Sequence, residues 1–213
     1  MPFPPDLSVL IGYSLACLIL FATPGPDMSL FLAKTLSGGR RAGMAAMTGA
    51  SLGCVMHSLA AAFGLTALIA ASPTLFLGLK IVGAAYLFWL AIAALRIGSA
   101  LSLATSRATP TPFWRTLGLG LSINLANPKA VLFFLTFLPQ FVDADDPRAG
   151  AKLLFLGLYF VLLTYPLAAL LILAADRAVR SLKRHPRVLR VIDWLFAGIF
   201  GAFAVRILVT PSR

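Results

Sequence analysis

Two residues of opposite charge stand in similar surroundings in the two halves of the sequence. Asp27 follows Pro24-Gly25-Pro26, and Lys129 follows Asn127-Pro128. Both lie within long apolar stretches, where an ionised side chain is costly and usually has a function. An acid and a base on facing segments could bind the ammonium and the carboxylate of an amino-acid zwitterion. We therefore predict a substrate site in which Asp27 and Lys129 make the charged contacts.

The prolines predict a break in the helix beside each charge. Pro24 and Pro26 each remove a backbone hydrogen bond and clash with the preceding turn, and Gly25 adds backbone freedom. Pro128 has the same effect on the second segment, where Asn124 and Asn127 could bond the freed backbone groups. Irregular backbone at membrane depth is tolerated only where it is buried in protein or lines a wet cavity. In transporters with paired breaks, the broken ends form the substrate site.

Each of these predictions has a simpler alternative. The two breaks could be ordinary proline kinks, and Asp27 could be solvated near the membrane surface, since Lys34 is close by. Tyr86 and Tyr159 are further candidates for lining a cavity, although a tyrosine in a membrane helix is more often a packing residue or an interhelical hydrogen-bond partner.

Composition places these residues in a membrane protein. Hydrophobic residues make up 60% of the 213, and mean hydropathy is +0.92, which is more apolar surface than a soluble core of this size could bury. The net charge of +11 could suggest nucleic acid. The basic residues form short clusters between apolar runs, however, and no soluble basic domain surrounds them. We therefore expect no nucleic-acid partner.

Six segments are apolar enough to cross a bilayer, which requires about 20 residues. They span 7–33, 44–71, 74–95, 116–141, 151–175 and 189–209. Matching motifs recur in the same order in the two halves, so we predict two three-helix repeats, about 1–97 and about 113–213, within a single transporter domain of residues 1–213. Because three is odd, the second repeat must be inverted in the membrane. The predicted fold is an all-α membrane protein with six transmembrane helices, of which the first and fourth are broken at their proline motifs.

Lysine and arginine predict the orientation, because they are enriched in cytoplasmic loops. The stretches 34–41, 96–115 and 177–190 carry most of them and fall on one side. Both termini are therefore predicted to face outside.

The proline motifs resemble those of the LysE/RhtB family of amino-acid exporters. The carrying residues are Ala22-Thr23-Pro24-Gly25-Pro26-Asp27, Asn124-Leu125-Ala126-Asn127-Pro128-Lys129-Ala130 with Phe133-Phe134, and Gly83-Ala84-Ala85-Tyr86-Leu87. The resemblance covers essentially the whole chain. It implies six membrane helices in a bacterial inner membrane and export of homoserine-, threonine- or leucine-like or basic amino acids, driven by a proton gradient or the membrane potential.

Two other functions remain open at this point. A metal-ion exporter would need several intramembrane carboxylates for hard cations, or thiolate and His clusters for soft ones. A membrane-embedded enzyme would need paired catalytic residues, and without any Glu the zinc motif His-Glu-x-x-His is impossible. We expect no enzymatic activity and no cofactor. The expected partners are an amino-acid substrate and membrane lipid, and a homodimer is an open alternative.

Overall fold

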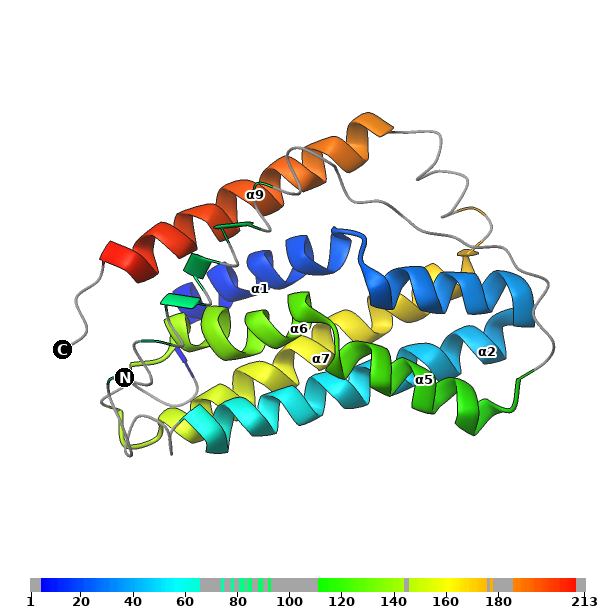
Figure 1. Cartoon of the computed structure of the whole chain (residues 1–213), viewed down its shortest axis with the longest axis horizontal. Coiled ribbons are helices and arrows are strands. Elements are labelled where there is room, and N and C mark those ends of the chain that lie inside the picture. The colour runs from blue at the N-terminus through cyan, green and yellow to red at the C-terminus, as the bar shows by residue number, and fades with distance from the viewer. Residues whose placement is uncertain are drawn as a thin grey trace.

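The computed structural model describes residues 5–65, 111–143, 146–175, 177 and 186–209, with scattered single positions between 74 and 92. Within these residues all regular structure is helical, and long helices lie side by side along the molecule (Figure 1). Most of the predicted third segment, 74–95, lies outside the described residues.

The described helices lie within the predicted apolar segments or begin a few residues before them, except for Pro26–Leu59, which runs from the first segment through the predicted loop into the second. The N-terminal half contains α1 (Leu7–Ala22), α2 (Pro26–Leu59) and a π-helical end, η1 (Ala60–Leu65). The fourth segment is divided into α5 (Phe113–Leu125), α6 (Pro128–Leu132), the π-helical η2 (Phe133–Phe137) and the 3-10 helix η3 (Leu138–Phe141). The last two helices are α7 (Ala149–Leu173) and α9 (Pro186–Val209).

Length and hydropathy identify fewer spans than the six predicted. Among the described residues, Pro26–Gly64 and Ala149–Leu173 could each cross a membrane, and the pair Phe113–Leu125 and Pro128–Phe141, bent by 54°, would be a third if it forms one span. The shorter apolar helix Leu7–Ala22 precedes them. The described part of the chain is thus all-helical with two or three candidate spans, and the six-helix count stays a prediction.

The end of the predicted first segment differs from the structure. The chain does not leave the helical conformation at residue 33, and within α2 the one non-helical residue is Gly39, with φ of 78°. A Cβ at Gly43 would lie 1.9 Å from Thr35 Oγ1 and 3.1 Å from the Phe31 carbonyl oxygen. Residues 31 and 43 of a straight helix would be roughly 18 Å apart, so α2 folds back on itself, as Figure 1 shows. Glycine permits this positive φ, and a reversal therefore replaces the expected loop.

Glycines let α2 and α5 cross at backbone contact. A Cβ at Gly49 would lie 2.0 Å from the Leu117 carbonyl oxygen, and a Cβ at Gly120 would lie 2.1 Å from that of Ala46. Neither clash could be relieved by a side-chain rotation, because the opposing atoms are backbone. This close approach is typical of small residues at membrane helix interfaces, and it brings the end of α5 against α2.

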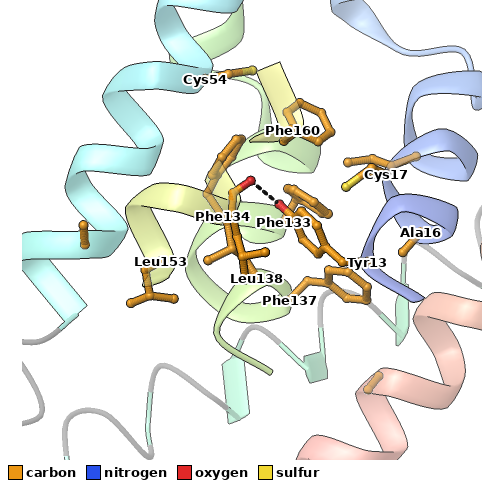
Figure 2. Packing of buried hydrophobic residues seen from close by; sticks show 14 of the residues in the cluster. Tyr13, Ala16, Cys17, Cys54, Phe133, Phe134, Phe137, Leu138, Leu153 and Phe160 are labelled. Carbon is orange, nitrogen blue, oxygen red and sulfur yellow. Dashed lines mark hydrogen bonds between the residues drawn. The ribbon is translucent and has the colours of Figure 1, made fainter. Parts of the chain in front are cut away.

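An aromatic cluster joins the second break to α1 and α7. Phe133 lies 6.1 Å from Tyr13 of α1 and 5.0 Å from Phe160 of α7 between ring centroids, and Phe134 lies 5.5 Å from Phe160. Figure 2 shows these rings packed together, with Phe137 below them. The hydroxyl of Tyr13 donates to the Leu156 carbonyl at 3.1 Å. The cluster fixes the segment that follows Lys129 against its neighbours.

Candidate functional site

Each proline motif ends one helix and begins another. In the first break α1 ends at Ala22 and α2 begins at Pro26, with Gly25 extended at the N-cap. In the second, α5 ends at Leu125 and α6 begins at Pro128. Proline suits the first helical position because its missing N–H would have no intrahelical partner there. The two charges therefore occupy the same place, the second residue of a new helix.

The second break is capped from within. The side-chain oxygen of Asn127 accepts a hydrogen bond from the Lys129 backbone N–H at 3.1 Å, which satisfies one of the donors exposed at a helix start. No side-chain cap is formed at Gly25. The start of α2, in the first break, therefore has no side-chain cap, whereas the start of α6, in the second break, has one.

The carboxylate of Asp27 is held by the second break. Its Oδ2 accepts one hydrogen bond from Asn124 Nδ2 and one from Asn127 Nδ2, both at 2.9 Å. Both asparagines are buried. The other oxygen, Oδ1, is buried and receives no hydrogen bond from the described residues. This environment does not fit the alternative of a solvated surface carboxylate.

The ammonium of Lys129 is held by the first break. Its Nζ donates to the carbonyl oxygens of Leu20 at 2.8 Å and Thr23 at 2.6 Å, at the C-terminal end of α1. A cation is favourable there, because unpaired carbonyls and the helix dipole make the end negative. A Cβ on Gly25 would lie 3.6 Å from Nζ, so the ammonium sits close against the break. Each charge thus reaches across to the opposite break.

Asn124 is positioned by the second part of α2. A Cβ at Gly53 would lie 2.3 Å from Asn124 Oδ1, so glycine is required at that position. The Cys54 thiol lies 3.7 Å from the same oxygen, and His57 Nε2 lies 3.3 Å from the Asn124 backbone carbonyl. The His57 ring also stacks on Phe134 with centroids 5.7 Å apart. These residues fix the amide that binds Asp27.

Asp27 and Lys129 line one cavity of about 100 Å³. A single water needs roughly 10–15 Å³ on this measure, so several waters or a small solute would fit. The polar lining residues are Thr23, Asp27, Ser51, Cys54, Asn124, Asn127, Lys129, Thr164 and Tyr165. The larger apolar ones are Leu20, Phe21, Met28, Phe31, Met47, Phe133, Phe134 and Phe160.

The predicted site residues do not all line the cavity. Gly25, Asp27, Asn124, Asn127 and Lys129 line the cavity, whereas Pro24, Pro26 and Pro128 shape the breaks without lining it. Tyr159 is not among the lining residues; its hydroxyl lies 2.8 Å from that of Ser14 on α1. Tyr86 lies outside the described residues.

Sequence reasoning missed two sets of contacts. The carbonyls of Leu20 and Thr23 carry no side-chain signal, so no pattern could identify them. The apolar wall of Met28, Phe31 and Met47 could have been suspected from the helical spacing of the first two residues.

Comparison with known proteins identifies the family of the chain. An uncharacterized membrane protein of Pseudomonas aeruginosa is 33% identical over 92% of each chain. Leucine efflux proteins of Enterobacter sp. and Klebsiella pneumoniae are 30% and 27% identical over 92% and 95% of each chain, respectively. No solved structure matches. The family model described as LysE type translocator matches residues 18–210. The chain therefore belongs to the LysE type translocator family.

Proposed function

We propose that this protein is a secondary transporter that exports an amino acid, whose ammonium binds Asp27 and whose carboxylate binds Lys129. One observation carries the proposal: a carboxylate with an unpartnered, buried oxygen and an ammonium line the same cavity, at the ends of two broken helices. Relatives named leucine efflux proteins support the direction and the substrate class. A fixed ammonium in the cavity disfavours the alternative of a metal cation, because like charges repel.

The walls of the cavity favour a leucine-like substrate over a basic one. Met28, Phe31 and Met47 line it, and all three are buried in the same apolar cluster. Among the described lining residues Asp27 is the acidic one. If Asp27 binds the substrate's main ammonium, the apolar wall is left for an uncharged side chain.

We infer that the two breaks are equivalent parts of an inverted repeat, with repeats of about 1–97 and about 113–213 in one transporter domain. The support is the reciprocity of the contacts: Asp27 of the first half accepts from Asn124 and Asn127, while Lys129 of the second half donates to Leu20 and Thr23. A two-fold axis between the breaks would place each charge against the opposite break in this way, although the partner atoms differ.

The proposed location is the bacterial inner membrane, with six spans and both termini outside. Large apolar side chains exposed on the described helices, such as Leu7, Trp114 and Leu162, suit contact with lipid. Reporter fusions after Ser106 and after Arg213 should report opposite compartments, and a cytoplasmic C-terminus would refute both the orientation and the number of spans. The homodimer stays a prediction, which the mass of the detergent-solubilised protein tests.

Inside-out membrane vesicles give the direct test of export. With an imposed proton gradient, vesicles containing the protein should accumulate labelled leucine, and Asp27→Asn and Lys129→Met should each abolish accumulation. Asp6→Asn and Arg190→Gln are the matched controls, because both side chains are exposed and neither lines the cavity. Membrane insertion of every variant is checked by immunoblot.

Two results would overturn the proposal. Normal leucine accumulation by Asp27→Asn would remove the assigned ammonium contact. Gradient-dependent uptake of a divalent metal, with none for a panel of neutral and basic amino acids, would favour a metal-ion exporter instead.

A further inference from the structure

We propose that Oδ1 of Asp27 is the coupling site, which holds either a proton or the substrate's ammonium but never both. The inference rests on the proposed function, since it concerns the same cavity and an amino-acid substrate. It adds a second ligand, the proton, and assigns it to one atom. Export of one amino acid would then require the entry of one proton.

The two oxygens of Asp27 have different roles in the structure. Oδ2 accepts from both Asn124 Nδ2 and Asn127 Nδ2, so the carboxylate is held in one orientation. An oxygen that already accepts two amide donors has little capacity for a proton of its own. Oδ1 is buried and has no donor among the described residues. A proton or an ammonium N–H arriving from the cavity therefore binds at Oδ1.

The two amides are held with their nitrogens toward Asp27. The side-chain oxygen of Asn127 is engaged by the Lys129 backbone N–H at 3.1 Å. The oxygen of Asn124 faces the Cys54 thiol at 3.7 Å, and Gly53 packs against it. Asn127 cannot turn its oxygen to Asp27 without losing the hydrogen bond from the Lys129 N–H, and a turned Asn124 would set its oxygen against the carboxylate oxygen. A proton on the carboxyl group is consequently directed to Oδ1 in every state that keeps this packing.

The other titratable groups around Asp27 belong to three elements. Lys129 on α6 is directed to the carbonyls of Leu20 and Thr23, which accept from the ammonium form. On the second part of α2, His57 contacts the Asn124 carbonyl and Cys54 contacts the Asn124 side chain. On α7, the Tyr165 hydroxyl contacts that of Thr48 at 3.2 Å. Of these groups His57 is the rival proton site, because a ring nitrogen of its imidazole can accept a proton.

The exchange balances in protons and charge. When the ammonium of a zwitterion arrives from the cytoplasm, the O–H bond at Oδ1 breaks and its proton leaves to cytoplasmic water. When the ammonium departs on the outside, a proton from that side binds Oδ1 and restores the neutral acid. One neutral zwitterion leaves for each proton that enters, so each cycle moves one positive charge inward. Both a pH gradient and an inside-negative potential then drive export.

Two ligands that differ by one group test the competition at Oδ1. Leucine carries the ammonium, and 4-methylpentanoate is leucine without it. With the full-length purified protein, the apparent dissociation constant for leucine should rise as the pH falls. Once Asp27 is mostly protonated, the rise should be about tenfold for each further unit of decrease in pH. That for 4-methylpentanoate should fall on acidification, because its carboxylate is repelled by ionised Asp27. In weakly buffered solution leucine should release up to one proton per molecule bound, and 4-methylpentanoate should release none.

Three variants assign the proton to its atom. Asp27→Asn should abolish proton release, whereas the exposed Asp6→Asn should release as much as the wild type. His57→Gln weakens the support of Asn124, so leucine should bind less tightly, but each bound molecule should still release a proton. If Asp27→Asn does not fold, the wild type and His57→Gln still decide the matter. Loss of proton release in His57→Gln, or its persistence in Asp27→Asn, would overturn the assignment.

The inference and the proposed function fail in different ways. If leucine binds and is transported but releases no proton at any pH between about 4 and 8, the coupling site is refuted and the exporter stands. The same holds if leucine and 4-methylpentanoate show the same pH dependence. If no amino acid binds at all, both are overturned.

Discussion

Adding one methyl group to Gly120 should separate α2 from α5, whereas the same change at Gly118 should not. A Cβ at Gly120 would lie 2.1 Å from the Ala46 carbonyl oxygen, and nothing lies within 4 Å of one at Gly118. To reach an ordinary contact of 3.4 Å, the two backbones must move apart by about 1.3 Å. Asn124 lies one turn further along α5, so the hydrogen bond that it donates to Asp27 at 2.9 Å should be stretched or lost.

The two variants should differ in stability by about 3 kcal/mol. Overpacking costs about 1–3 kcal/mol, and the upper end applies because backbone opposes the methyl group. Replacing glycine by alanine inside a helix returns about 1 kcal/mol. Gly120→Ala should therefore lower the free energy of unfolding by about 2 kcal/mol, which at this chain length lowers Tm by roughly 4–8 °C. Gly118→Ala should raise the free energy of unfolding by about 1 kcal/mol and Tm by roughly 2–4 °C.

The assay is thermal unfolding of the detergent-solubilised protein, followed by size-exclusion chromatography, together with leucine uptake into vesicles. Gly120→Ala should lower both Tm and uptake, and Gly118→Ala should keep uptake. Equal Tm and equal uptake for the two variants would show that α2 and α5 do not cross at backbone contact.

Three further changes test other parts of the structure. The hydrogen bond from Lys152 lowers the pKa of Asp146 from its ordinary 3.8 to about 2. The stabilisation that Asp146→Asn removes should therefore be complete above about pH 4 and disappear as the pH falls toward 2, as Tm measurements at several pH values would show. Saturating leucine should slow labelling of Cys54, which lines the cavity, by a small thiol reagent in a Cys17→Ser background, and equal rates with and without leucine would contradict the site. Tyr159→Phe should cost about 1 kcal/mol of stability, read from the shift in Tm, and leave leucine uptake unchanged, because the hydroxyl contacts Ser14 and not the cavity.

The breaks could be predicted from sequence because proline acts locally. Pro26 and Pro128 disrupt any helix that would run through them, and both stand at the start of a new helix. The reversal at Gly39 differs from the predicted loop of ten residues between the first two segments. The composition of this stretch does not distinguish a tight turn at one residue from a longer loop. The position of Tyr159 depends on how α7 is rotated about its axis, which packing against α1 decides and periodicity does not. The long-range contacts of Lys129 with backbone carbonyls leave no trace in residue types.

The structure also explains how two opposite charges can line one cavity, as the proposed substrate site requires. A direct ion pair between Asp27 and Lys129 would have to be broken before a zwitterion could bind, and separating a buried pair is costly. Here neutral groups hold each charge: two amides bind Asp27, and two carbonyls bind Lys129. These dipoles are fixed by the helix breaks, so they offset part of the cost of burial while the cavity is empty. In the proposed site the broken helices therefore do more than make room for a substrate, because they supply the side-chain amides and backbone carbonyls that hold Asp27 and Lys129 apart.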